Sequence, residues 1–426
     1  MRIGLVLGVL VLEQKHRTSE DDDEDEYDVQ ACGYVIEFMA QRTKGPCVIL
    51  FRPMRAGPVT VAGRLARSAT FEAASDAQGR PGEAIRDLYV ALARGGAPWI
   101  VSGFAYILPN GRSVATQNGI HSDELVGPWR RITEAVHQER AEVKFFMQIV
   151  HGGRQVPAEL VSEPIAPSAV PVGSGGVRPR EMTAREIEET LDAFGQAARR
   201  AREAGFDGVQ LHCAHGYLLS EFLSPHTNRR TDEWGGTPER RRRFVIEAFR
   251  RARAAGGPDL AVTVKLNCED FIQDGLSLAE SCEAARALAA EGIDAIEVSG
   301  WMAEGDARCA PVRKGDPKPQ EEAYYLTQAV EIKRAVGAVP VGACGGFRSY
   351  EVMVRALEGD GLDFVAVSRP FIAEPDFVAR LRAGQPRATC ISCNECSSRR
   401  NGPVHCPLVA DGRLKPPAPG LFPPMS

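Results

Sequence analysis

Two histidines and a tyrosine lie close together in a segment that reads LHCAHGYLLSEFLSPHTNRRTDEWGG, residues 211–236. His212 and His215 are three residues apart, and Tyr217 follows two residues later. Imidazole and phenol groups transfer protons and donate hydrogen bonds, which makes this group a candidate for acid–base chemistry. Two histidines at this spacing are equally compatible with a structural role. Without a nearby carboxylate they are only a weak indication of a metal site.

Two segments further along the chain could hold a phosphate group. They read GACGGFRS, residues 342–349, and VSRPFIAEP, residues 367–375. Adjacent glycines let backbone N–H groups approach an anion closely, while a serine and an arginine add donors ahead of a short helix whose N-terminus is partially positive. Either segment alone could be only a tight turn, but together they favour a phosphate ligand. The candidate phosphate contacts are Gly345, Gly346, Ser368 and Arg369.

Three polar side chains interrupt apolar runs elsewhere: Thr70 in RSAT, Gln148 in FFMQIVH and Lys265 in VTVKLN. A buried polar group without a partner costs about 1–3 kcal/mol, so these side chains are expected to contact a polar ligand. A phosphate at one edge, with hydroxyl, amide and ammonium groups across the rest of the site, would suit FMN. On these residues alone the alternative is a phosphate-binding lyase or aldolase with Lys265 as a Schiff-base residue.

These side chains need elements that bring them together, and the chain repeats one pattern from about residue 48 onward. A short β-branched apolar run is followed by a loop and then by a helical pattern. Eight such units predict an α/β fold, a single-domain (β/α)8 TIM barrel with parallel strands, whose C-terminal strand ends meet at one mouth. The predicted strands are residues 65–70, 99–105, 144–151, 208–214, 261–267, 295–300, 339–346 and 364–369.

The predicted helices carry start and stop signals. Thr183 and Glu186 match a capping box, and Ile187, Leu191 and Phe194 then recur at helical spacing. The segments GLSLAESCEAARALAAEG and EEAYYLTQAVEIKRAVG show the same pattern and end in glycine. A doubly wound open sheet would need a glycine-rich dinucleotide fingerprint after its first strand, and ARSATFEAASDAQG contains none.

With these motifs in place, the chain resembles a known family. HCAHGYLLSEFLSPHTNRRTDEWGG is similar to the signature of the old yellow enzyme family of FMN-dependent ene-reductases. The resemblance continues through GRLARSATFEAASDAQGRP, WIVSGFAYILPNGR, FFMQIVHGGRQ, GACGGF and VSRPFIAEPDFV, and it extends over residues 48–381. It implies a TIM barrel that binds FMN and uses NAD(P)H to reduce the C=C bond of α,β-unsaturated carbonyl compounds.

The resemblance also implies roles for individual residues. Lys265, where many relatives have arginine, would lie beside the electron-rich edge of the flavin. Lysine keeps the positive charge of the arginine but cannot form its two parallel hydrogen bonds. His212 and His215 would donate hydrogen bonds to the substrate's carbonyl oxygen, and Tyr217 would protonate the α carbon. The other implied FMN contacts are Thr70 and Gln148 at the ring, Ser68, Ala69 and Ala105 along it, and Gly345, Gly346, Ser368 and Arg369 at the phosphate.

Four cysteines cluster near the C-terminus in TCISCNECSSRRNGPVHC: Cys390, Cys393, Cys396 and Cys406. The segment resembles the [4Fe–4S] segment of larger relatives, the 2,4-dienoyl-CoA reductase and trimethylamine dehydrogenase type, although the third and fourth spacings are shorter. Those relatives continue into a second dinucleotide-binding domain, for which this chain is expected to have no room. Three alternatives stay open for these cysteines: a [4Fe–4S] cluster, a structural zinc, or no metal at all.

Two other functions stay open on this sequence. An FMN-dependent dehydrogenase or demethylase that passes electrons onward would use the cysteine segment. A flavin-binding protein without turnover would leave His212, His215 and Tyr217 without a purpose. The expected partner is a small unsaturated carbonyl compound, and the long loop of residues 301–320 is expected to form the upper wall of its pocket.

Composition and charge narrow the class of protein. The chain has 426 residues, of which 44% are hydrophobic and 25% charged, and its formal net charge is −5. Acidic residues outnumber basic ones and the arginines are spread out, which argues against a nucleic-acid partner. Seven of the eleven cysteines lie singly, as buried free thiols would, and this indicates a reducing, cytoplasmic location.

The N-terminal residues depart from the barrel pattern. The apolar run at residues 3–12 is too short to span a bilayer, and an acidic run, EDDDEDEYD, follows it without a cleavage site. We therefore expect neither secretion nor a membrane partner. Residues 1–47 are expected to form a disordered acidic extension, residues 48–385 the FMN-binding barrel, and residues 386–426 a cysteine-containing segment with a proline-rich tail.

Overall fold

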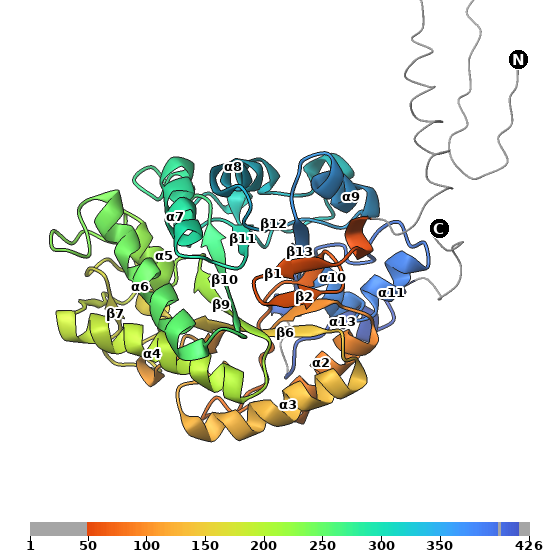
Figure 1. Cartoon of the computed structure of the whole chain (residues 1–426), viewed down its shortest axis with the longest axis horizontal. Coiled ribbons are helices and arrows are strands. Elements are labelled where there is room, and N and C mark those ends of the chain that lie inside the picture. The colour runs from red at the N-terminus through yellow and green to blue at the C-terminus, as the bar shows by residue number, and fades with distance from the viewer. Residues whose placement is uncertain (1–48, 399–401, 417–426) are drawn as a thin grey trace, which may run out of the picture. The chain divides into compact units, whose positions relative to one another are not determined.

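Eight parallel strands close into a barrel, and helices surround it on the outside (Figure 1). The barrel strands are β3 (Leu65–Arg67), β4 (Trp99–Val101), β6 (Lys144–Val150), β9 (Gly208–Cys213), β10 (Ala261–Asn267), β11 (Ile296–Ser299), β12 (Val341–Cys344) and β13 (Phe364–Val367). Each pairs in parallel with its neighbours, and the pairing of β4 with β6 closes the ring. The structure is a computed structural model that describes residues 49–398 and 402–416. The predicted (β/α)8 barrel is confirmed.

The outer layer consists of the helices that follow the strands. They are α2 (Glu83–Arg94), α3 (Val126–Glu139), α4 (Ala184–Glu203), α6 (Pro238–Gly256), α7 (Leu278–Ala290), α8 (Leu326–Val336), α9 (Tyr350–Glu358) and α11 (Phe377–Arg382). The predicted capping box starts α4: the Thr183 hydroxyl accepts from the Glu186 N–H, and the Glu186 carboxylate accepts from the Thr183 N–H. Ile187, Leu191 and Phe194 are fully buried against the barrel, as their spacing predicts.

A short antiparallel hairpin closes the N-terminal end of the barrel. It consists of β1 (Met54–Ala56) and β2 (Val59–Val61), and it lies in front of the strands in Figure 1. Met54 packs in one apolar cluster with Trp99 and Phe364, which are the first residues of β4 and β13. Because side chains fill this end, a ligand cavity has room only at the opposite, C-terminal end of the strands.

The second strand was predicted to extend over residues 99–105, and this predicted length is wrong. β4 ends at Val101, and the chain bends before β5 (Ala105–Tyr106) pairs with the far end of β6. The physical reason is a tertiary contact, because the Gly103 N–H donates a 2.7 Å hydrogen bond to the buried carboxylate of Glu72 and so leaves the β-ladder.

The chain after the barrel folds back onto it. The Ala388 N–H donates to the Arg348 carbonyl, and the Val404 N–H donates to the Glu72 carbonyl in the loop between β3 and α2. The remaining short elements are β7 (Ile165–Ala166), β8 (Arg180–Glu181), α5 (Leu218–Leu223), α10 (Arg369–Ala373), α12 (Glu395–Ser398), α13 (Pro407–Ala410) and 3-10 turns at Ile49–Phe51, Pro109–Gly111, Asp123–Leu125, Gly153–Gln155, Ala307–Cys309 and Pro319–Glu321.

In the part of the chain that the structure describes, no helix is both long enough and apolar enough to cross a membrane. The expected acidic extension, residues 1–47, lies outside the described residues. The boundaries of the barrel and of the C-terminal segment stay predictions, as does the cytoplasmic location.

The capping box of α4 gives a test of the fold. Replacing Thr183 by alanine removes the side chain that accepts from the first turn of the helix, and we expect the free energy of unfolding to fall by about 1 kcal/mol. Urea unfolding followed by circular dichroism measures the change. Thr183→Ser keeps the hydroxyl and should unfold like the wild type, so an equal loss in both variants would contradict the capping role.

Candidate active site

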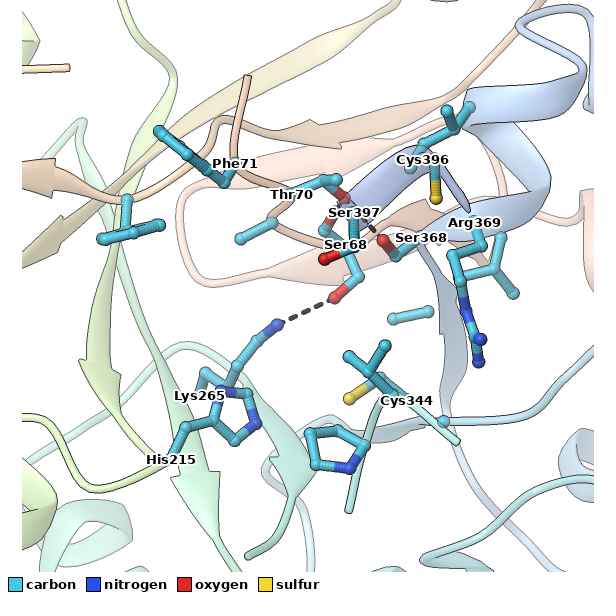
Figure 2. A pocket seen from close by; sticks show the side chains of 18 of the residues that line it. Ser68, Thr70, Phe71, His215, Lys265, Cys344, Ser368, Arg369, Cys396 and Ser397 are labelled. Atoms are coloured by element: carbon cyan, nitrogen blue, oxygen red, sulfur yellow. Dashed lines mark hydrogen bonds between the residues drawn. The ribbon is translucent and has the colours of Figure 1, made fainter. Parts of the chain in front are cut away.

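A cavity of about 280 Å³ opens at the C-terminal end of the barrel strands. Its volume is close to the lower end of the range for small-molecule and cofactor sites. Figure 2 shows side chains from several strand ends pointing into it. The predicted site residues that line it are Ser68, Ala69, Thr70, Gln148, His212, His215, Tyr217, Lys265, Gly345, Gly346, Ser368 and Arg369.

Ala105 is the predicted ring contact that does not line the cavity. It is fully buried in β5, whereas its neighbour Phe104 lines the cavity. The prediction came from the family resemblance, which implied that Ala105 lies along the flavin ring. After Val101 the chain bends out of the strand, and Phe104 lines the cavity where Ala105 was expected, so the prediction for Ala105 is corrected.

Lys265 lies in the cavity wall as part of a buried ion pair. Its Nζ lies 3.0 Å from Oε1 of Glu297 and donates a 2.8 Å hydrogen bond to Oγ of Ser68 (Figure 2). Ser68 in turn donates a 2.6 Å hydrogen bond to the same carboxylate oxygen. The three side chains are only 2–3% exposed. A buried ammonium group needs such partners, because an isolated charge in the interior is strongly unfavourable.

The same carboxylate connects the ion pair to the other predicted ring contact. Oε2 of Glu297 accepts a 2.8 Å hydrogen bond from Gln210, and Oε1 of Gln210 accepts one of 2.8 Å from Gln148. A continuous buried network therefore runs from Gln148 on β6 to Lys265 on β10. Sequence reasoning missed Gln210 and Glu297, although both are polar residues inside apolar strand runs, the signal that identified Gln148 and Lys265.

His212, near the end of β9, is a neutral imidazole. Burial lowers its pKa well below the ordinary value of 6.5, and the neighbouring His215 and Lys265 lower it further. Its side chain lines the cavity, and within the described residues its Nδ1 is buried without a hydrogen-bond partner. A polar group of a bound ligand would satisfy this nitrogen, so the site is built for an occupant with hydrogen-bonding atoms.

His215 occupies a left-handed backbone conformation, with φ of 63°, which is uncommon for a residue other than glycine. Its N–H donates to Oδ1 of Asn267 at 3.2 Å, and its carbonyl accepts from Gln155 at 2.8 Å. Nε2 lies 2.6 Å from the hydroxyl of Ser299, and burial lowers the pKa of the imidazole to about 3. When Ser299 donates to Nε2, the neutral ring carries its proton on Nδ1 and offers that N–H to a ligand.

Tyr217 stands immediately before α5, beside the two histidines. Its ring centroid lies 4.8 Å from that of His212 and 5.5 Å from that of Phe104, and the two histidine rings are 5.3 Å apart. Burial raises the pKa of Tyr217 to about 12, so the phenol keeps its proton at neutral pH. The structure therefore brings together the three side chains that the sequence segment singled out, while their catalytic roles stay predictions.

The opposite end of the cavity has the backbone that a phosphate contact requires. Gly345 and Gly346 have φ of 106° and 80°, and a Cβ atom on Gly346 would collide with the ring of Tyr324. Only glycine fits there without strain. The hydroxyl of Ser368, which precedes α10, lies 2.7 Å from that of Thr70, so the phosphate end and the ring end are directly connected (Figure 2).

Arg369 lies between this cavity and the cysteine segment. Its side chain is mostly buried, and Nη1 donates 2.7 Å hydrogen bonds to the carbonyl of Arg313 and to Oδ1 of Asn394. The guanidinium is thus held in place from the loop after β11 and from the C-terminal segment. The hydrogen bond to Asn394 therefore links the predicted phosphate end of the cavity to the cysteine segment.

The four clustered cysteines line a second, small cavity next to the first. Cys396 lines both cavities, and Figure 2 shows its sulfur on the side of Arg369. Burial, together with the nearby Cys390, raises the pKa of the Cys396 thiol to about 11. Among residues 49–398 and 402–416, no three His, Cys, Asp or Glu side chains lie close enough to hold a single metal ion. The cysteines that line the second cavity are Cys390, Cys393, Cys396 and Cys406.

The remaining walls are largely apolar. Phe71 and Phe104, whose ring centroids are 5.5 Å apart, stand above the ends of β3 and β4. Pro311 and Val312 come from the loop of residues 301–320 that was expected to form the upper wall, and Val404 comes from the C-terminal segment. Apart from the loop, sequence reasoning missed these residues, because an aromatic or aliphatic side chain in a loop carries no pattern that separates a pocket wall from the core.

The lowered pKa values of His212 and His215 predict how stability depends on pH. Between about pH 3 and 6.5 the unfolded chain binds a proton on His215 and the folded chain does not, so acid favours the unfolded state. The pKa of His212 is also lowered well below 6.5, so His212 acts in the same direction. We expect the free energy of unfolding to fall as pH is lowered through this range, by up to about 1.4 kcal/mol per pH unit for each histidine.

Denaturant unfolding at a series of pH values measures this slope. The double variant His212→Asn/His215→Asn should have a shallower slope than the wild type. Replacing the exposed His405 by asparagine is the matched control and should leave the slope unchanged. A double variant as acid-sensitive as the wild type would contradict the neutral state of the two rings.

Comparison with known proteins places this geometry in a family. The model of the NADH:flavin oxidoreductase / NADH oxidase family matches residues 49–388. An NADH oxidase of Thermoanaerobacter brockii is 35% identical over 350 residues, which are 81% of this chain and 52% of that protein. The chain thus spans about half the length of this curated relative.

Two solved structures have the same architecture. 2-Naphthoyl-CoA reductase in complex with 2-naphthoyl-CoA gives a TM-score of 0.74 at 28% identity, over 81% of this chain and 54% of that one. The old yellow enzyme homologue of Zymomonas mobilis gives 0.66 at 29% identity, over 81% of this chain and 95% of that one. The family resemblance seen in the motifs is confirmed, and the chain belongs to the NADH:flavin oxidoreductase / NADH oxidase family, which includes the old yellow enzymes.

Proposed function

We propose that this protein is an NAD(P)H-dependent FMN oxidoreductase that reduces the C=C bond of α,β-unsaturated carbonyl compounds. The observation that carries the proposal is the grouping of His212, His215 and Tyr217 in one cavity whose other end has a glycine backbone suited to phosphate. Family membership supports FMN as the cofactor and NAD(P)H as the reductant. The substrate class rests on the three side chains.

The residues present fit FMN. Thr70, Gln148 and Lys265 offer a hydroxyl, an amide and an ammonium group at one end of the cavity. His212 lines the same cavity, and its buried Nδ1 has no hydrogen-bond partner among the described residues. Gly346 lets the backbone approach a phosphate at the other end. When bound, FMN would accept a hydride from NAD(P)H and pass it to the β carbon of the alkene.

The protein's own groups would complete the reduction. As the β carbon gains a hydride, the π electron pair moves toward the α carbon and the carbonyl oxygen, and His212 and His215 would donate hydrogen bonds to that oxygen. Tyr217 would then give its proton to the α carbon and recover one from solvent. In balance, alkene, NAD(P)H and one proton yield the saturated carbonyl compound and NAD(P)⁺.

Replacing Tyr217 by phenylalanine tests the acid role. We expect the reduction of cyclohexenone to slow by about 10²–10⁴-fold, the usual contribution of a positioned acid, because no other group is assigned to protonate the α carbon. Reduction of the flavin by NADPH should keep its rate, since that step needs no proton from the phenol. Stopped-flow absorbance measures the two half-reactions separately.

Tyr106→Phe is the matched control, because Tyr106 is a buried tyrosine outside the cavity whose hydroxyl donates to the Gln78 carbonyl. It should leave both rates unchanged. An unaffected enone rate in Tyr217→Phe would overturn the acid role. Bound FMN that NAD(P)H does not reduce would favour the alternative of a flavin-binding protein without turnover.

We further propose that the cysteine segment holds a [4Fe–4S] cluster. The observation in its favour is that four thiols from two stretches of the segment line one cavity, and that Cys396 also lines the flavin cavity. When present, the cluster would accept electrons from the reduced flavin, as the dehydrogenase alternative requires.

Metal analysis of anaerobically purified protein tests this proposal. We expect about four iron and four acid-labile sulfide per chain, and a loss of both in Cys393→Ser. Cys282→Ser replaces a buried thiol on α7 and should retain them. Zinc without sulfide would favour the structural-zinc alternative, and the absence of iron, sulfide and zinc would show that the cysteines bind no metal.

A further inference from the structure

Glu297 is a buried carboxylate that the proposed reaction does not use. It lies in β11 and is 2% exposed. Both of its oxygens are engaged: Oε1 with Ser68 at 2.6 Å and with Lys265 at 3.0 Å, and Oε2 with Gln210 at 2.8 Å. These donors offset the cost of burying a carboxylate this deep inside the barrel.

The charged side chains that line the cavity beside this carboxylate are all basic. Among the described residues, the cavity lining contains the cations Lys265, Arg348 and Arg369 and no aspartate or glutamate. Arg369 stands at the phosphate end, and Arg348 donates to the Cys390 carbonyl and the Ser392 hydroxyl. Lys265 is thus the cation at the ring end, and Glu297 is its counter-ion.

We propose that Glu297 is a positioning residue that sets the reduction potential of the bound flavin by offsetting the charge of Lys265. The inference rests on the proposed function, because it requires FMN in the cavity. A flavin gains negative charge on two-electron reduction, and a nearby cation favours that state. A carboxylate 3.0 Å from the cation opposes the effect, lowers the potential and makes the reduced flavin a stronger hydride donor.

Glu297 also fixes the geometry of the ring contacts. Through Gln210 it orients the amide of Gln148, and together with Ser68 it holds the Lys265 ammonium in one position. Cys344 lines the same part of the cavity, and burial raises the pKa of its thiol to about 11, so it adds no charge at neutral pH. The charge balance at the ring end is therefore set by Lys265 and Glu297.

Redox titration of the FMN-loaded protein tests the proposal. Glu297→Gln keeps the shape of the side chain and removes its charge, and we expect the ratio of reduced to oxidised flavin at a fixed potential to rise at least tenfold, about 30 mV for a two-electron couple. Lys265→Met should shift the potential in the negative direction. The double variant Lys265→Met/Glu297→Gln should return toward the wild-type value.

Removing the negative charge of Glu297 and the positive charge of Lys265 should shift the reduction potential in opposite directions. A loss of packing does not depend on the sign of the charge that is removed, so opposite shifts indicate a charge effect. Asp294→Asn is the matched control, because Asp294 is a buried carboxylate three residues earlier that accepts from the Val262 N–H and pairs with Arg253. It should leave the potential unchanged. If Glu297→Gln does not fold, the comparison of Lys265→Met with the double variant reports the same effect of Glu297.

Two negative outcomes are distinguishable. Wild-type protein that cannot be loaded with FMN would overturn the proposed function itself. Protein that binds FMN and reduces enones, but whose potential is the same with and without the Glu297 charge, would overturn only the role assigned to Glu297.

Discussion

One carboxylate inside the barrel, that of Glu297, holds the open end of the structure together. Its hydrogen bonds join β11 to Ser68 after β3, to Gln210 on β9 and to Lys265 on β10, and Gln210 extends the network to β6. TIM-barrel interiors are usually filled with layers of apolar side chains. A polar layer in their place is stable only when every member has a partner, and the partners here come from different strands. The strand ends are therefore fixed relative to one another before any ligand is present.

The loop that carries His215 depends on the same strand. Ser299, the last residue of β11, contacts the imidazole of His215, while Asn267 and Gln155 hold its backbone in the left-handed region. A conformation of this kind costs about 1–3 kcal/mol and persists only where its surroundings impose it. Since the ring is neutral, its orientation toward a ligand is decided by hydrogen bonding alone. These contacts therefore hold the imidazole of His215 in one orientation at the edge of the cavity.

Much of the fold was readable in the sequence, because eight repeats of an apolar run, a loop and a helical pattern leave few architectures open. The site was readable where a polar residue interrupts a strand. Ala105 came from the family resemblance and does not line the cavity, because the preceding strand ends at a contact with Glu72, about thirty residues away in sequence, which no local pattern reveals. Glu297 and Gln210 are also polar residues inside apolar strand runs, but sequence reasoning did not single them out. This pattern marks residues that bind ligands and residues that bind one another alike. Only the three-dimensional pairing tells these two groups apart.

The sequence shows that the four cysteines are close together along the chain. It does not show that they line one cavity, because this depends on how the C-terminal segment folds back onto the barrel. This return of the chain also affects the order of assembly. Asn394, Cys396 and Val404 supply part of the flavin cavity's wall, and the barrel closes only when β13 pairs with β3, some three hundred residues earlier in the chain. Contacts between such distant segments form slowly. During synthesis on the ribosome the cavity therefore stays incomplete until these C-terminal residues have emerged.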